Sequence, residues 1–423
     1  MKFLKFLIAL IYANVVFYTA AFSQNLVNNG NGIVINNGAY LVIGGKYINR
    51  NATQDGFVDN DGNMIVYGDF INNATNNVFV NIESNPDGKT IMPALSQQSI
   101  SGTNTTRFEN LKVSGGIKNL DAHHALVAGN FILASVFKLN SHTLELEKSS
   151  PVVLDYQSGY LMAETEPSYG LGILRWNLND QGGTYNIPFG SGMASNNDIN
   201  LTIKVVQCAL GNGAINFSTY PTNSSNVPLP DFVSSLEPYD PEVTVNRFWL
   251  IDAEHSTKPS VEITFKYTDI DANSILENTL GAIRYNCNAM AWDDFLPNGV
   301  ADVIENTVTT NTVAPNDFFK NWTLTGSSPD DYIYIPNSFT PNGDGNNEWF
   351  APIIGNDELL SDYSFMIFDR WGSMVFSSTT QDKGWDGMRE GIECQQDVYV
   401  WVFGYRDIRG SNVVKMGKVT LIR

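Results

Sequence analysis

The sequence predicts an all-β protein, and three observations lead to this fold class. The composition is rich in residues typical of strands and tight turns, with 35 Gly and 18 Tyr among many Asn and Thr. Apolar and polar residues alternate with a period of two in several runs, most regularly at residues 261–267. The length of 423 residues allows about three domains. We therefore expect a β-solenoid-like region at residues 24–154, a β-sandwich at 155–328 and a C-terminal β-sandwich at 333–423.

The charge balance excludes some classes of partner. Lys and Arg total 25 and Asp and Glu total 44, which gives a net charge of −19. Nucleic acids and anionic membrane surfaces are bound through basic patches, so neither is expected as a partner. Charged residues make up only 16% of the chain and hydrophobic residues 43%, so a disordered acidic chain is excluded as well.

Residues 1–23 have the layout of a secretory signal peptide. Lys2 and Lys5 form a basic start, an almost continuous apolar run follows at 6–22, and Ala21 and Ser23 supply the small residues of a cleavage site. A transmembrane anchor of similar length is the alternative. Export would place the chain where disulfides form. Of the three cysteines, Cys208 and Cys287 could pair, but single buried thiols, Cys394 included, are the favoured interpretation.

The first region contains a short internal sequence repeat. The pattern Gly-x-aromatic-Ile occurs at 45–48, 68–71 and 129–132, each time after an apolar strand. The first two copies are separated by about one solenoid turn, and the third lies much further on. Asn-rich turns, such as that at 36–38, tolerate the backbone of sharp corners. Stacked turns of a β-solenoid are therefore expected, with an ordinary antiparallel sandwich as the alternative.

The second region reads as a two-sheet unit. Runs at 201–206 and 243–249 resemble the alternating strand at 261–267. We expect Trp249, Trp292 and Trp322 to fill the space between the sheets; an aromatic sugar-binding platform is the alternative.

After a polar linker at 327–331, the C-terminal region carries unusual sequence blocks at 335–350, 367–372, 384–387 and 417–423. The residues that define them are Pro336, Asn337, Phe339, Thr340, Pro341, Asn342, Gly343, Asp344 and Gly345, then Arg370, Trp371 and Gly372, then Trp385, Asp386 and Gly387.

In their order and spacing these blocks closely resemble the gliding-motility-associated C-terminal domain, the type B sorting domain of Bacteroidetes proteins exported by the type IX secretion system. The resemblance covers residues 333–423 and implies an Ig-like β-sandwich that serves as an outer-membrane address. It also implies two partners, the type IX machinery and a PorP/SprF-type outer-membrane protein. Two positions depart from the family, with Glu348 in place of Asp and Asp397 in place of Gly.

The residues themselves agree with a small sandwich. Phe365, Ile367, Val375 and Phe376 alternate as inward-facing positions would. Trp371 and Trp385 adjoin glycines, which allows their rings to lie against bare backbone. Arg370 could stack on an aromatic ring or pair with Asp386, or it could be simply exposed.

One loop of this domain is a candidate calcium site. Asn342, Asp344, Asn346 and Glu348 occupy alternate positions, with Gly343 and Gly345 between them. Hard oxygen ligands in such a loop suit Ca²⁺, at modest affinity because only two are charged. The favoured alternative is a loop whose side chains bond its own backbone.

Other motifs for chemistry are scarce. His123, His124, His142 and His255 lie in no zinc-ligand spacing and are expected in turns or on the surface. Acidic turns at 59–63 and 269–273 could wrap a cation, but solvated turns are the favoured interpretation. A catalytic pair of carboxylates is an open alternative, and nothing in the sequence favours Asp155 and Glu164 over other acidic residues as that pair.

The sequence therefore favours a non-enzymatic protein, secreted or on the cell surface, with no cofactor beyond an optional Ca²⁺. Adhesion and an accessory role in gliding fit this class, with an extracellular glycan or surface as partner. The alternative is a carbohydrate-active enzyme or glycan-binding protein on a β-helix. A groove lined by aromatic rings and carboxylates would favour the enzyme, and a smooth Asn/Thr face would favour a scaffold.

Overall fold

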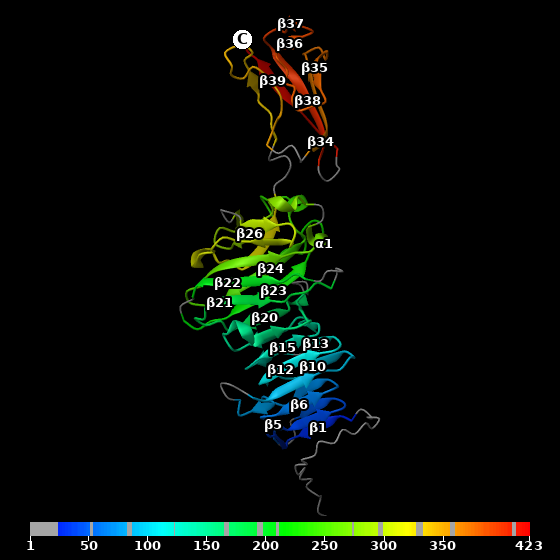
Figure 1. Cartoon of the computed structure of the whole chain (residues 1–423), viewed down its shortest axis with the longest axis vertical. Helices are drawn as coiled ribbons and strands as arrows, with labels where there is room; N and C mark the ends of the chain where they lie inside the picture. Colours follow the sequence, from blue (N-terminus) through cyan, green and yellow to red (C-terminus); the bar gives the residue numbers. More distant parts are fainter. Residues whose placement is uncertain are drawn as a thin grey trace, which may run out of the picture.

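The computed structural model is an elongated, nearly all-β molecule in which the chain advances from one end to the other (Figure 1). Within its described residues the single α-helix is α1 (Asp269–Ala272), and no helix is long and apolar enough to cross a membrane. The structure describes residues 24–50, 54–82, 87–121, 123–164, 169–192, 198–208, 211–272, 275–294, 299–326, 333–355, 360–407 and 412–423. The expected signal peptide lies outside these residues.

The N-terminal part is a parallel β-solenoid with three strands in each turn, one on each of three faces. The first face consists of β1 (Leu26–Asn29), β4 (Tyr47–Arg50), β7 (Phe70–Asn73), β10 (Gln98–Gly102), β13 (Lys118–Leu120), β16 (Phe137–Lys138) and β19 (Leu161–Met162). Another face consists of β3 (Tyr40–Ile43), β6 (Asn63–Val66), β9 (Lys89–Met92), β12 (Asn110–Ser114), β15 (Phe131–Ala134) and β18 (Leu154–Tyr156). The remaining face begins with β2 (Gly32–Ile35), β5 (Phe57–Asn60) and β8 (Phe79–Val80).

The strand register explains the spacing of the Gly-x-aromatic-Ile repeat in the sequence. Tyr47 pairs with Phe70, so the first two copies of the Gly-x-aromatic-Ile pattern stack directly on one another. Phe131, from the third copy, lies on β15, which belongs to a different face. The pattern therefore marks a type of corner rather than a fixed position in the turn, and this is why the third copy is out of step.

Asparagines form a ladder inside the solenoid. Asn28 pairs with Asn49 and Asn49 with Asn72, and all three side chains are buried. The Asn49 amide donates to the Gly56 carbonyl at 2.8 Å, and the Asn72 amide to the Thr105 carbonyl at 2.9 Å. Asn49 thus bonds the corner that follows its own strand, whereas Asn72 bonds the corner of the next turn, so the ladder ties main-chain carbonyls within and between turns.

The third solenoid face is interrupted between β8 and β11, and from β11 onward it continues into the central region as a single sheet. Its nine-stranded sheet consists of β11 (Thr106–Phe108), β14 (Ala125–Val127), β17 (Thr143–Leu146), β20 (Ile173–Trp176), β23 (Ile215–Pro221), β24 (Arg247–Ala253), β30 (Asn321–Thr325), β26 (Gly281–Asn286) and β27 (Ala291–Asp294). Strand β20 pairs in parallel with β17 and antiparallel with β23, which is where solenoid becomes sandwich. One buried core runs through both parts. Whether residues 24–154 and 155–328 fold as separate domains stays a prediction.

The second sheet of the sandwich completes the central core. It consists of β21 (Gly183–Ile187), β22 (Leu201–Gln207), β25 (Ser260–Lys266), β29 (Thr307–Thr309) and β28 (Val300–Asp302). Trp249 and Trp322 both lie against Phe265 of this sheet, with ring centroids 5.1 and 5.7 Å from it, as expected of rings between two sheets. Trp292 is also buried, but it packs against Phe248 in a separate cluster. All three tryptophans are covered, so the sugar-binding platform is excluded.

The cysteines differ from expectation. Cys208 and Cys287 are free and exposed, and Cys394 is free and partly buried. No bridge joins Cys208 to Cys287, and the favoured interpretation of buried thiols was wrong for both. The reason is local, because each follows the last residue of its strand, β22 or β26, and so lies beyond the packed part of the sheet.

The C-terminal domain has its own core. Its main sheet consists of β32 (Ser338–Phe339), β39 (Asn412–Leu421), β38 (Val398–Asp407), β34 (Leu360–Phe368) and β35 (Met374–Ser378). Two short antiparallel pairs accompany it, namely β31 (Ile333–Tyr334) with β33 (Ile353–Ile354) and β36 (Met388–Arg389) with β37 (Ile392–Glu393). Phe365 and Ile367 are fully buried, and Val375 and Phe376 pack against them, as predicted.

Candidate functional site in the C-terminal domain

The first motif block and the last strand meet on the domain's core. β32 pairs in parallel with β39, so Phe339 lies opposite Leu421. Phe339 is buried, with its ring centroid 5.2 Å from that of Trp385. Blocks from three distant parts of the sequence thus form one structural unit.

Hydrogen bonds from Arg423 hold the Trp385–Gly387 block against the last strand. The Arg423 guanidinium donates to the carbonyls of Cys394 at 2.6 Å and Gly387 at 2.9 Å. Gly387 has a φ of +78°, and a Cβ there would crowd Pro341, Arg423 and Leu421. A glycine is therefore needed at this position. The sequence offered no local signal for the role of Arg423, because its partners are distant in the chain.

The turn after β34 presents an exposed cation–aromatic pair. Asp369 accepts hydrogen bonds from the backbone N–H groups of Trp371 at 2.9 Å and Ser373 at 2.8 Å. The Arg370 guanidinium lies 4.3 Å from the centre of the Trp371 ring and pairs with Asp397 at 3.3 Å. Of the three alternatives for Arg370, the structure shows stacking on the neighbouring ring, with a side chain that is also 57% exposed.

Two related expectations were wrong. The partner of Arg370 is Asp397 rather than Asp386, because Asp386 accepts from the Met388 N–H within its own turn at 2.9 Å. Trp371 is 72% exposed, since the turn carries it beyond the sheet, whereas Trp385 is fully buried. Asp397, one of the two departures from the family pattern, thus forms an ion pair that glycine could not form.

The proposed calcium loop is held by its own hydrogen bonds. Glu348 accepts from the N–H groups of Gly343 at 2.9 Å and Gly345 at 2.8 Å. Asp344 accepts from the Asn346 N–H at 2.8 Å, and Asn342 accepts from the Asp344 N–H at 3.1 Å. Both glycines have positive φ, which such a tight loop requires. This geometry agrees with the backbone-bonded turn.

The carboxylates of this loop are therefore already engaged. The N–H of Asn346, together with the Asn342 amide, lowers the pKa of Asp344 below its ordinary value. Among the described residues, no group of three or more His, Cys, Asp or Glu side chains is arranged to hold a metal. Calcium binding by Asn342, Asp344, Asn346 and Glu348 stays a prediction.

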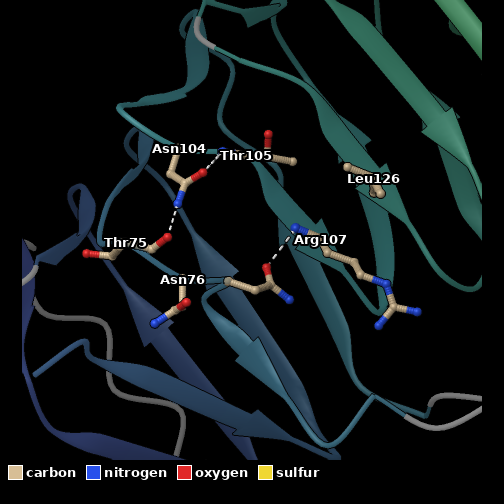
Figure 2. Close-up of a pocket in the computed structure, with 7 residues that line it drawn as sticks. Thr75, Asn76, Asn104, Thr105, Arg107 and Leu126 are labelled. Carbon is tan, nitrogen blue, oxygen red and sulfur yellow. Dashed lines mark hydrogen bonds between the residues drawn. The ribbon is translucent and has the colours of Figure 1, made fainter.

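A shallow hollow lies in the wall of the solenoid. We call it the solenoid hollow; its volume is about 310 Å³. It is lined by Thr75, Asn76, Asn77, Asn104, Thr105, Arg107 and Leu126 (Figure 2). It lies where β8 and β11 follow one another without a main-chain ladder, and the Asn77 side chain accepts from the Arg107 N–H at 2.9 Å instead. Five of its seven lining residues are Asn or Thr.

The remaining polar residues mostly serve the fold. The acidic turn at 269–272 is helix α1, and Asp271 is buried in an ion pair with Arg247 at 3.1 Å. Arg247 also binds Glu164 at 3.0 Å. The expectation of a solvated turn was therefore wrong for Asp271, because an arginine from β24 lies against it. Asp155 is exposed.

Among the described residues the histidines form no metal-binding group, although burial lowers the pKa of His142 and the nearby His124 and His123 lower it further. His123 and His124 are exposed, and His142 is partly buried. His255 is only 6% exposed and its Nε2 lies 2.9 Å from the Asn179 carbonyl, so the expectation of a surface position was wrong for this residue. Burial lowers the pKa of His255, which favours its neutral form.

The other acidic turn, at 59–63, lies beside an unexpected buried carboxyl. Glu109 is 5% exposed, and its Oε2 has no hydrogen-bond partner. A Cβ on Gly88 would overlap both this oxygen and the Asn60 carbonyl oxygen, so the two oxygens lie close together. Burial, reinforced by the charges of Asp61 and Asp59, raises the pKa of Glu109 to about 7.

The C-terminal domain is thus a self-contained β-sandwich in which separate sequence blocks hold two structured turns at its surface. Residues 333–421 match the family model of the CHU_C type IX secretion signal domain. The chain therefore carries a type IX sorting domain at its C-terminal end, in agreement with the resemblance seen in the sequence. A search of curated proteins finds no significant match to the chain.

Proposed function

We propose that this is a non-enzymatic protein of the cell surface or secreted medium, exported in two steps. Residues 1–23 would direct it to the periplasm, and the sorting domain would then direct it across the outer membrane. The observation that carries the proposal is the type IX secretion signal domain at residues 333–421. We further propose the type IX machinery and a PorP/SprF-type outer-membrane protein as its partners.

The body, residues 24–326, would act as an extracellular scaffold in adhesion or as an accessory of gliding. Two features support this role. The solenoid and sandwich share one core, which makes the body a continuous elongated unit. The solenoid hollow has an Asn- and Thr-rich lining, as expected of a scaffold rather than of a groove built for hydrolysis.

Glycan binding is the second candidate, and the solenoid hollow is the observation that favours it. Amide and hydroxyl groups pair well with sugar hydroxyls, and Leu126 offers an apolar contact. A glycan array probed with the full chain, together with an Asn76→Ala variant, would test this. Equal glycan binding by the wild-type and Asn76→Ala chains would exclude the hollow as the glycan-binding site.

Deletion of residues 333–423 tests the export proposal. The truncated chain should accumulate in the periplasm of a bacterium that has a type IX system, because the outer-membrane address is gone. The measurement is the amount of protein in the periplasmic, surface and medium fractions, with a periplasmic enzyme as the control for leakage. Normal surface delivery of the truncated chain would contradict the proposal.

A further inference from the structure

The sorting-domain sheet buries one face and leaves the other open. Residues that pair directly in an antiparallel sheet project from the same face. Phe365 and Phe403, which pair, are both fully buried on the core side. Their neighbours along the strands, Met366 and Val402, also pair and project from the opposite face.

This opposite face is apolar across several strands. Val402 pairs in turn with Met416, which is 72% exposed, and Gly404 pairs with Val414, which is 65% exposed. Further along, Phe368 pairs with Val400. We call this surface the valine–methionine face; its apolar residues are Met366, Phe368, Val398, Val400, Val402, Val414 and Met416. Ser364, Ser377 and Thr420 project from the same side. An apolar patch of neighbouring residues that stays open to solvent marks an interaction surface.

The charge on this face is unusual for the chain. Lys418 pairs with Val400, so it projects from the same face, and its side chain is exposed. The paired positions that form the face contain no acidic residue, although Asp and Glu outnumber Lys and Arg in the chain by 44 to 25. A complementary partner would therefore present apolar side chains with a carboxylate opposite Lys418.

We propose that the valine–methionine face is the surface by which the sorting domain docks on a receptor protein of the export machinery. The receptor would bury the row Met366–Val402–Met416 and set a carboxylate against Lys418. This inference rests on the proposed export function. It adds which surface of the sorting domain the receptor binds and which chemical groups make the contact. The alternative occupant is a second copy of this chain.

The test uses the full chain with the paired substitutions Val414→Thr and Met416→Gln. Both side chains are mostly exposed, so the core is untouched, and Thr suits a strand. The matched control carries Ile353→Thr and Ile392→Gln, two exposed apolar residues of the same domain outside this face. We expect the exported fraction to fall at least tenfold for the first chain and to stay unchanged for the control.

Lys418→Glu provides a second, independent variant. Reversing the charge should repel the receptor's carboxylate and lower export several-fold, whereas Lys418→Arg should export normally. Thermal unfolding of each purified chain shows whether its fold is intact. If the Val414/Met416 chain proves misfolded, the exported fraction of the Lys418→Glu chain tests the inference instead.

Three results would overturn the inference. One is normal export of the folded Val414/Met416 chain, and another is normal export of Lys418→Glu. The third is a concentration-dependent dimer of the wild-type chain, seen by sedimentation and lost in the Val414/Met416 chain, which would assign the face to self-association. Each leaves the export function standing if deletion of residues 333–423 still blocks delivery, so the two proposals fail separately.

Discussion

The buried carboxyl of Glu109 makes the stability of the solenoid depend on pH. Its carboxyl lies against the Asn60 carbonyl with the acids Asp59 and Asp61 nearby, and its pKa of about 7 keeps it largely protonated below neutrality. The unfolded chain has an ordinary glutamate pKa, near 4.3. Between these two values the folded state binds the proton and the unfolded state does not, so stability falls as pH rises through this window.

Glu109→Gln should remove this dependence. The neutral amide can donate to the Asn60 carbonyl at any pH, so the variant should be more stable than wild type by about 1–3 kcal/mol at pH 8. Near pH 4.5 the two chains should be nearly equal. Thermal unfolding of the full chain across pH 4.5–8 measures this, with the exposed Glu305→Gln as the control. A constant difference at every pH would contradict the assignment of the proton to Glu109.

Residues with distant partners mark the limit of sequence-based prediction at this scale. The motif residues of the C-terminal domain were found because they are adjacent in sequence and unusual in type. The ion pair of Asp271 with Arg247 and the contacts of Arg423 were missed, because partners separated by many residues leave no local pattern. The same holds for Trp371, whose exposure depends on where the turn leaves the sheet.

At the scale of the element, the corners of the solenoid depend on polar groups inside the coil. Asn28, Asn49 and Asn72 stack in register, and their amides donate to main-chain carbonyls, those of Phe57, Gly56 and Thr105. Period-two alternation predicted the strands, and the glycine corners predicted the coil. The assignment of each strand to a face was not predictable, because corner sequences recur on more than one face, as the third copy at 129–132 shows.

Asn49→Ala tests the ladder. The substitution leaves the buried Gly56 carbonyl without its donor, so the free energy of unfolding should fall by about 1–3 kcal/mol. Asn36→Ala, at an exposed corner, should change it by less than about 0.5 kcal/mol. Urea denaturation of the full chain provides the comparison. Equal effects of the two substitutions would show that the ladder adds nothing to stability.

On the scale of the whole molecule, the chain consists of two bodies with separate cores. One core extends from the first solenoid turns to the end of the sandwich, and the other is confined to residues 333–423. A domain read as an address has to present the same surface whatever protein precedes it. A separate core is the physical basis for such independence.

The isolated fragment 333–423 should therefore fold by itself. Its aromatic core and main sheet are formed entirely within the fragment, so nothing essential is removed with the body. A heteronuclear NMR spectrum should show well-dispersed amide signals that overlay those of the domain in the full chain. Collapsed signals from the fragment alone would show that the domain needs the body in order to fold.

The most direct test of the central claim, that residues 333–423 are an export address, is transplantation. A foreign globular protein would be placed between a signal peptide and this fragment and expressed in a bacterium with a type IX system. Surface and medium fractions would be assayed for the foreign protein, with the same fusion lacking residues 333–423 as the control. The account predicts that only the complete fusion leaves the periplasm. Retention of both fusions in the periplasm, despite a folded C-terminal domain, would contradict it.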